Sequence, residues 1–146
     1  MSIVAGAISL AMLGNPIVDE AQQECLAMNI YHESRGEVIE GQIAVAHVTL
    51  NRVAHRNWPG SICEVVYQDS QFSWTFQIAN PTPQNQKAWD QALVIARDVM
   101  IGNTEDPTKG ATFYHANYVN PSWASQMTVS KVVGVHIFYT WDGIWD

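Results

Sequence analysis

The chain has 146 residues, enough for one domain with a sizeable core and too few for two ordinary domains. Hydrophobic residues make up 47% of the sequence and charged residues 14%, which excludes a disordered chain. The net charge of −7, with seven Lys and Arg in total, predicts no nucleic-acid partner and no stable membrane insertion. We expect a monomer.

Residues 3–13 are apolar apart from Ser9. The segment is too short to cross a bilayer, which takes about 20 helical residues, and it lacks the basic residues that open a signal peptide. We therefore expect an N-terminal helical extension over residues 1–19 that packs on a core of residues 20–141. A remnant of a membrane-targeting element is the alternative.

Two helices are expected at the start of the core. Asp19 is placed to cap a helix over residues 20–34, whose faces are largely apolar. Gly36 interrupts the pattern, and a second amphipathic helix follows over residues 38–55. The spacing of its apolar residues puts Arg52 on the outer side of this second helix.

The next segments are shorter. Residues 61–67 indicate a short helix or turn, and the alternation of aromatic and polar residues over 72–76 suits a short strand or a structured loop. A third clear helix is expected with Thr82 as its N-cap and Pro83 at its first position. Gly102 is placed to end it.

Two strands are expected late in the chain, over residues 112–116 and 132–139, because β-branched and aromatic residues alternate there with other types. A loop that contains Trp and Asn residues, 118–127, lies between them. Helices first and a small sheet late predict an α+β fold, mainly helical with a small antiparallel sheet, in a single domain.

Cys25 and Cys63 are far apart in the sequence and show neither a CxxC motif nor a metal-type spacing. Two small, unpaired, buried side chains are the favoured interpretation. A disulfide is the alternative, if the two Cα atoms come within about 7 Å. The redox compartment is therefore left open.

Glu33 is the strongest catalytic candidate. It falls on the same helix face as Leu26 and Ile30, and desolvation against aliphatic groups raises the pKa of a carboxyl group. A carboxylic acid that is protonated near neutral pH can donate its proton to a glycosidic oxygen. The competing interpretation is a glutamate at a helix end that forms a salt bridge with Arg35 or Arg52.

A second catalytic carboxylate is not evident. Glu37, Glu40, Glu64 and Asp69 are the candidates, and none can be placed opposite Glu33 from the sequence. A conventional glycosidase needs a pair about 5 to 9.5 Å apart. The sequence therefore favours a mechanism in which one carboxyl group acts both as acid and as base.

The five histidines raise the question of metal chemistry. The His-Glu pair at 32–33 is not followed by the second histidine of a zincin helix, and the other spacings match no ligand pattern. We predict no metal and no other cofactor. A zinc peptidase or amidase, formed if His32, His115 and His136 converge, is kept as an alternative.

Ordered sequence motifs carry a family resemblance: YHESRGE at 31–37, EGQIAVA at 40–46, LNRV at 50–53, ICEVVY at 62–67, QFSW at 71–74, GATFYH at 110–115 and GVHIFY at 134–139. Together they resemble the spore cortex-lytic enzyme and related cell wall hydrolase family over roughly residues 22–139. The resemblance implies a lysozyme-like α+β fold and a single catalytic domain over residues 1–146.

The resemblance also implies an activity. Members cleave the glycan strand of peptidoglycan between N-acetylmuramic acid and N-acetylglucosamine, usually as lytic transglycosylases that form 1,6-anhydro ends. The first glutamate of the family's Glu-Ala/Ser-Arg-Gly-Glu motif is catalytic, and it falls on Glu33. A hydrolytic muramidase and a non-catalytic glycan-binding module are the remaining alternatives.

Substrate-binding residues follow from the same motifs. We expect polar side chains to line the sugar site and tryptophan rings to stack on sugars; the residues are Gln71, Ser73, Trp74, Tyr114, His115, Trp123 and His136. His32 stands where members commonly have glycine, so it narrows the site or adds a donor.

The place of action is expected to be the bacterial cell wall, in the periplasm or outside the cell. The chain shows no wall-binding repeat and no convincing export signal, which resembles a phage endolysin. Such an enzyme is made in the host cytoplasm and released by a separate membrane pore.

Overall fold

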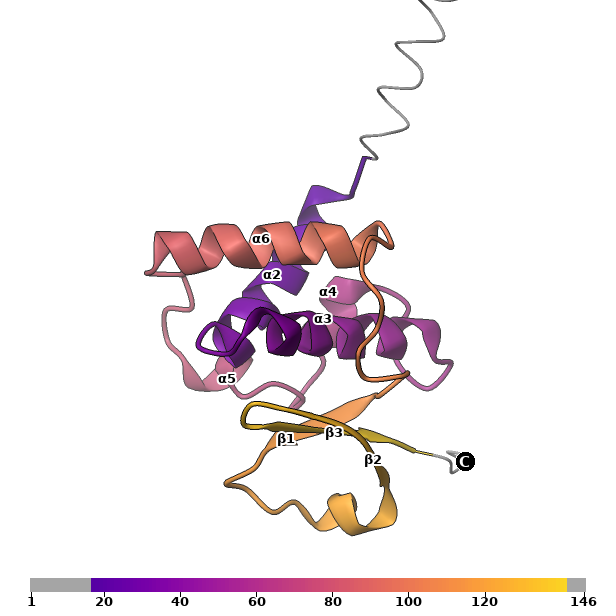
Figure 1. Cartoon of the computed structure of the whole chain (residues 1–146). Coiled ribbons are helices and arrows are strands. Elements are labelled where there is room, and N and C mark those ends of the chain that lie inside the picture. Colours follow the sequence, from indigo (N-terminus) through magenta and orange to yellow (C-terminus); the bar gives the residue numbers. More distant parts are fainter. Residues whose placement is uncertain (1–16, 142–146) are drawn as a thin grey trace, which may run out of the picture.

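The computed structural model describes residues 17–141, so the helical extension expected over residues 1–19 lies outside the described residues up to residue 16. Helices form one part of the molecule and a small sheet packs beneath them (Figure 1). In chain order the elements are α2 (Glu20–Ser34), α3 (Ile39–Ala54), α4 (Ile62–Val66), α5 (Trp74–Gln77), α6 (Gln86–Met100), β1 (Phe113–Ala116), the 3-10 helix η1 (Ser122–Gln126), β2 (Thr128–Val133) and β3 (His136–Thr140). The predicted α+β class is confirmed.

Helix α2 is central and begins as expected. The Asp19 carboxylate accepts hydrogen bonds from the backbone N–H groups of Ala21 and Gln22, at 2.9 and 3.2 Å, and so satisfies two free donors of the first turn. Leu26 and Ile30 are fully buried where α2 packs against α4 and α6. The burial of α2 against these helices fixes the direction of its C-terminal end.

Helix α3 is buried on two sides, because it lies between the other helices and the sheet (Figure 1). Ala46 faces the α2 side, whereas Val45 and Val48 pack with Phe138 of the sheet. The expectation that Arg52 lies on the outer side is wrong: Arg52 is 5% exposed. The apolar spacing marked only one of the two buried faces of α3.

The third long helix begins later than expected. Asn85, rather than Thr82, is the N-cap of α6, and its side chain accepts a hydrogen bond from the N–H of Ala88 at 3.0 Å. The hydroxyl of Tyr31 accepts from the N–H groups of both Gln84 and Asn85, each at 3.1 Å, which holds the preceding loop outside the helix. The C-terminal prediction is confirmed, since a glycine at position 102 with φ +77° follows the helix.

The segment expected to be a strand or structured loop over residues 72–76 contains a one-turn helix, α5, instead of a strand. Its first residue, Trp74, donates its indole N–H to the Asn29 side chain in the core, at 2.8 Å. The backbone N–H of Gln77 donates to the carbonyl of Ser73 at 2.8 Å and closes the turn. The burial of Trp74 therefore determines the structure of this segment, and the alternation of aromatic and polar residues does not.

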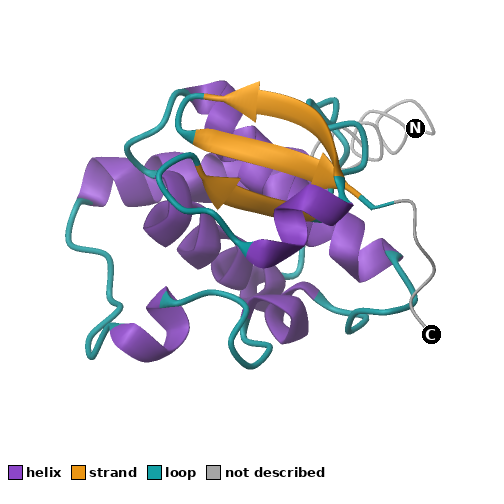
Figure 2. Ribbon diagram, turned by 90° about the horizontal axis from the view of Figure 1, so that it is seen from below, coloured by secondary structure: helices purple, strands orange, loops and turns teal. Residues whose placement is uncertain are grey.

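The sheet has three antiparallel strands in the order β1, β3, β2, and the long α-helices lie behind it in Figure 2. The expectation of one strand over residues 132–139 is wrong, because the chain reverses at Gly134 and Val135. Gly134 has φ +56°, and Val133 pairs with His136 across the turn. The alternation of Val and Ile residues continues through this turn and hides it in the sequence.

Cys25 of α2 and Cys63 of α4 form a disulfide, with their Cα atoms 5.2 Å apart. The favoured interpretation of unpaired cysteines is therefore wrong, because the packing of α4 on α2 brings the two side chains together. Within residues 17–141, no helix combines the length and the hydropathy that a membrane crossing requires.

Candidate active site

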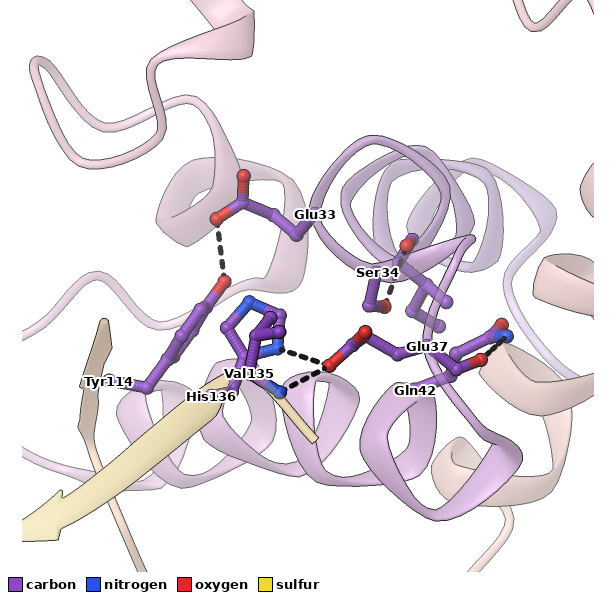
Figure 3. A network of polar contacts seen from close by, with 8 residues as sticks. Glu33, Ser34, Glu37, Gln42, Tyr114, Val135 and His136 are labelled. Carbon is purple, nitrogen blue, oxygen red and sulfur yellow. Dashed lines mark hydrogen bonds and ion pairs between the residues drawn. The ribbon is translucent and has the colours of Figure 1, made fainter. Parts of the chain in front are cut away.

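The last turn of α2 brings Glu33 to the edge of the sheet. The phenolic hydroxyl of Tyr114, on β1, donates a hydrogen bond to Oε1 of Glu33 at 2.7 Å (Figure 3). The two residues are 81 positions apart in the sequence, so the contact depends on the fold and not on a local motif. Both side chains are partly buried.

Burial raises the pKa of Glu33, while the Tyr114 hydrogen bond and the positive charge of Arg52 act in the opposite direction. The pKa of Tyr114 is raised well above its ordinary value, first by burial and then by the Glu33 charge and hydrogen bond. Tyr114 therefore stays a donor, and Glu33 holds its proton to a higher pH than an exposed glutamate does.

Arg52 lies inside the protein next to this pair. Its Nε donates to the carbonyl oxygen of Thr112 at 2.8 Å, and its Nη1 donates to Oε1 of Gln71 at 3.2 Å. Burial lowers the pKa of Arg52, yet a guanidinium keeps its charge in a protein. Three aromatic rings lie 5.5 to 5.6 Å from its guanidinium carbon, those of Trp58, Phe72 and Phe113.

The competing interpretation of Glu33, a salt bridge at a helix end, does not describe this arrangement. Among residues 17–141, neither Arg35 nor Arg52 comes within 4.0 Å of the Glu33 carboxylate as an ion pair. Arg35 instead places its guanidinium over the ring of Tyr31 and donates to the Tyr31 carbonyl. Glu33 is left with a neutral hydrogen-bond donor and a nearby buried cation.

His136 lies behind Tyr114 and is 7% exposed. Its ring meets the Tyr114 ring nearly edge-on, with centroids 5.3 Å apart. Burial is the largest cause of the lowered pKa of His136, and Glu37, 3.7 Å from its Nδ1, acts in the opposite direction. His136 therefore supports Tyr114 from behind and does not touch Glu33.

His115 is held by its own sheet. Its Nδ1 lies 2.7 Å from the carbonyl oxygen of Ala116, which can only accept, so Nδ1 carries the proton and Nε2 accepts from the Tyr139 hydroxyl at 2.7 Å. The His115 and Tyr139 rings stack at 5.2 Å. Trp123 of η1 packs against this pair and keeps partial exposure.

His32 and Trp74 point to another part of the molecule. The Nε2 of His32 donates to the carbonyl of Pro81 at 2.7 Å, and its ring stacks on Trp74 at 4.6 Å. Trp74 is 3% exposed and lies in the core cluster around α2, which corrects the expectation that its ring stacks on a sugar. His32 supports the loop before α6 rather than adding a donor beside Glu33.

Gln71 and Ser73 occupy the exposed segment that leads into α5. Gln71 contacts Arg52, so it borders the Glu33 site through that contact. Ser73 is the N-cap residue of α5 and makes no side-chain capping hydrogen bond. Of the expected substrate-binding residues, Tyr114 therefore contacts Glu33, Gln71 borders it through Arg52, and His136 packs against Tyr114. His115 follows Tyr114 on β1, so its side chain points to the other face of the sheet, where it packs with Tyr139 and Trp123.

Metal ligation receives no support in the described part of the chain. Within residues 17–141, no group of three or more His, Cys, Asp or Glu side chains is arranged to hold a metal ion. His32 does not join His115 and His136, and both ring nitrogens of His115 already have partners. The alternative of a zinc site built from these three histidines is therefore not formed.

Two site residues were missed by the sequence reasoning. Arg52 was placed outside, although the LNRV motif itself marks this position. Glu37 was considered only as a second catalytic carboxylate, whereas Figure 3 shows its carboxylate turned to Val135 and His136, away from Glu33. The glycine at position 134, inside an apparent strand, is the signal that points to a close contact there.

Comparison with known proteins shows to which family the chain is similar. The family model described as Cell Wall Hydrolase matches residues 36–139. Spore cortex-lytic enzymes of Halalkalibacterium halodurans and Bacillus cereus are 29% and 30% identical to the chain over 119 residues. These matches cover 79% of the chain but 33% and 42% of the relatives, so the chain spans less than half the length of either.

Two solved structures show the same similarity at the level of the fold. The catalytic domain of the Bacillus cereus SleB protein gives a TM-score of 0.69 at 28% identity, covering 85% of this chain and 93% of that chain. The catalytic domain of the germination-specific lytic transglycosylase SleB from Bacillus anthracis gives the same TM-score and identity, covering 84% and 97%. The expected lysozyme-like α+β fold is thereby confirmed. The chain belongs to the cell wall hydrolase family.

Proposed function

We propose that this chain cleaves the glycan strand of peptidoglycan between N-acetylmuramic acid and N-acetylglucosamine, as a lytic transglycosylase with Glu33 as its catalytic acid and base. The observation that carries the proposal is a half-buried carboxyl group with a raised pKa, which accepts a hydrogen bond from Tyr114. The likeness to a domain described as a lytic transglycosylase supports the same reaction.

The proposed reaction needs one carboxyl group. Protonated Glu33 donates its proton to the glycosidic oxygen, and the bond from that oxygen to C1 of N-acetylmuramic acid breaks. The sugar's own 6-hydroxyl then bonds to C1 and gives its proton to the Glu33 carboxylate. The product carries a 1,6-anhydro ring, no water is consumed, and Glu33 is protonated again.

The neighbours of Glu33 suit its charged intermediate state. When Glu33 has given up its proton, the Tyr114 hydroxyl donates to the carboxylate and the buried charge of Arg52 attracts it. Without these partners, formation of the Glu33 carboxylate in a desolvated site would cost much more free energy. The exposed Gln71 is proposed to contact the sugars beside this centre, and the partly exposed His115 and Trp123 to contact them farther along the sheet. His136 is buried behind Tyr114 and is proposed to act through that residue.

The proposed place of action is the bacterial cell wall. The disulfide between Cys25 and Cys63 supports a location in an oxidising compartment, such as the periplasm or the exterior. The spore cortex-lytic enzymes that match the chain are named for a wall structure. Release of a phage enzyme by a separate pore, and the monomeric state, stay predictions.

Product analysis tests the reaction. Purified protein is incubated with peptidoglycan, and the soluble fragments are identified by mass spectrometry, with Glu33→Gln as the matched inactive variant. We expect 1,6-anhydro-muramic ends from the wild type and no release by the variant. Reducing ends would indicate a hydrolytic muramidase instead. New amino groups with sensitivity to EDTA would indicate an amidase or peptidase, and binding without release would indicate a glycan-binding module.

A further inference from the structure

A second glutamate, four positions after Glu33, makes contacts that the proposed reaction does not use. We propose that Glu37 is a positioning residue, whose carboxylate fixes the β2–β3 turn against the end of α2 and thereby keeps Tyr114 on Glu33. The inference rests on the proposed function for its meaning in catalysis, but its central measurement does not require activity.

The Glu37 side chain reaches from the α2–α3 connection to the sheet. Its Oε1 accepts a hydrogen bond from the backbone N–H of Val135 at 2.9 Å and lies 3.7 Å from Nδ1 of His136 (Figure 3). The Glu37 side chain is 18% exposed and the His136 side chain 8%, although the hydrogen bond to Val135 itself lies at the surface. One carboxylate therefore joins the connection after α2 to both the turn and the first residue of β3.

The backbone of Glu37 is fixed as well. Its N–H donates to the carbonyl of Ser34 at 2.9 Å, and its own carbonyl accepts from Nε2 of Gln42 at 3.0 Å. Both partners are buried, one at the end of α2 and the other in α3. The carboxylate thus extends from a segment that is held at both ends.

Two glycines leave room for this side chain. A Cβ at Gly134 would overlap Oε1 of Glu37, and φ of +56° there is itself unfavourable for other residues. A Cβ at Gly41 would come within 3.2 Å of the Glu37 Cβ. The glycine backbone thus lies close to the Glu37 carboxylate at Gly134 and close to its Cβ at Gly41, which indicates that the contact is built into the fold.

The pairing of β3 with β1 connects the turn held by Glu37 to Tyr114. Tyr114 of β1 pairs with Phe138 of β3, and their rings are 5.4 Å apart. The His136 ring also meets the Tyr114 ring, at 5.3 Å, between Tyr114 and Glu37 in Figure 3. A displacement of β3 at its first residue therefore moves the phenol that donates to Glu33.

The pKa of Glu33 depends on where the Tyr114 hydroxyl lies. The charged and titratable groups around the path are Glu37, His136 and His115 on one side and Tyr114, Arg52 and Glu33 on the other. Because the Tyr114 hydrogen bond lowers the pKa of Glu33, withdrawal of the phenol raises it further. A change at Glu37 should therefore be visible at Glu33, although the two side chains do not touch.

The experiment is an NMR pH titration of the Glu33 carboxyl carbon, assigned by its absence in Glu33→Gln. Glu37→Ala is expected to raise the pKa of Glu33 in the same direction as Tyr114→Phe, and the double variant is expected to show no further change. Glu37→Gln keeps an acceptor for the N–H of Val135 and is expected to match the wild type. Glu40→Ala, an exposed carboxylate on α3, is the matched control.

An unchanged pKa of Glu33 in folded Glu37→Ala, or additive changes in the double variant, would overturn the inference. If Glu37→Ala does not fold, Glu37→Asp replaces it, because the shorter side chain withdraws from Val135 while keeping its charge. The alkaline limb of kcat/KM should move upward with the NMR value. A chain that does not cleave peptidoglycan would refute the proposed function, yet the titration would still decide the role of Glu37.

Discussion

The two ends of α2 are held by different kinds of interaction. Near its start, the Cys25–Cys63 disulfide and the packing of Leu26 against α4 and α6 fix the helix covalently and by apolar burial. At its other end, Glu33 and the following Glu37 reach the sheet through polar contacts. The first region contains the covalent link, and the second contains the carboxyl group whose pKa is raised by burial.

The largest expected effect is the loss of activity in Glu33→Gln. Proton transfer by a positioned side chain contributes typically about 10²- to 10⁴-fold, so we expect the lysis rate to fall by at least about 100-fold. The amide keeps an acceptor for Tyr114, and the free energy of unfolding should not decrease. Turbidity loss of cell walls and chemical denaturation measure the two quantities.

The matched control for this prediction is Glu40→Gln, which neutralises an exposed carboxylate nearby. It should lyse walls at the wild-type rate. A Glu33→Gln protein that retains wild-type lysis would remove Glu33 from the reaction and leave the polar end of α2 without a catalytic role.

The next effect concerns the other end of α2. Replacement of Cys25 and Cys63 by Ala opens a loop between residues 38 positions apart, and the chain-entropy model gives about 3 to 4 kcal/mol of lost stability. The contacts of Glu33 lie at the far end of the helix, so specific activity of the folded protein should persist at low temperature. Denaturation midpoints and lysis rates, each with and without a reductant, check both statements.

A loss of specific activity in the folded double Cys variant would contradict the separation of the two ends. The wild type treated with a reductant is the internal comparison, because it breaks the same bond without changing the side chains.

The sequence predicted the region that is governed by local signals. The N-cap at Asp19, the extent of α2 and the glycine after α6 are encoded by neighbouring residues, and each was confirmed. The raised pKa expected for Glu33 was confirmed as well, because the aliphatic face of a buried helix is visible in the residue spacing. Family motifs added the lysozyme-like fold, which spacing did not contain.

The polar region was less predictable because its contacts join distant residues. The burial of Arg52 follows from the packing of the sheet on the second face of α3, and no spacing within α3 shows that. The turn at Gly134 was masked by β-branched residues on both sides. Trp74 was expected at the sugar site, but a long-range hydrogen bond to Asn29 holds it in the core.

A smaller effect is the pH dependence of stability at the polar end. The pKa of Glu33 is raised in the folded protein, so the folded state binds more protons than the unfolded state between the ordinary and the raised pKa. Stability contributed by this group is present at low pH and is lost as pH rises through that window. The stability advantage of Glu33→Gln over the wild type should therefore grow with pH.

Denaturant unfolding of both proteins at several pH values measures this difference, and other titrating groups cancel because both proteins contain them. A difference that stays constant with pH would mean that the pKa of Glu33 is not raised, which would contradict the burial argument for its proton.

The smallest effect is expected for Glu40, whose exposed carboxylate reaches the β2–β3 hairpin from outside. Glu40 of α3 lies 3.9 Å from the Lys131 ammonium of β2, and both side chains are well exposed to solvent. Exposed pairs of this kind contribute about 0 to 1 kcal/mol, so Glu40→Ala should change stability by less than about 1 kcal/mol, and less still in high salt.

Glu37 also reaches this hairpin but is largely buried and accepts a backbone hydrogen bond, so its removal should cost more than that of Glu40. If denaturation shows equal costs for Glu37→Ala and Glu40→Ala, burial does not distinguish the two carboxylates, and the polar end of α2 is held by the sheet alone.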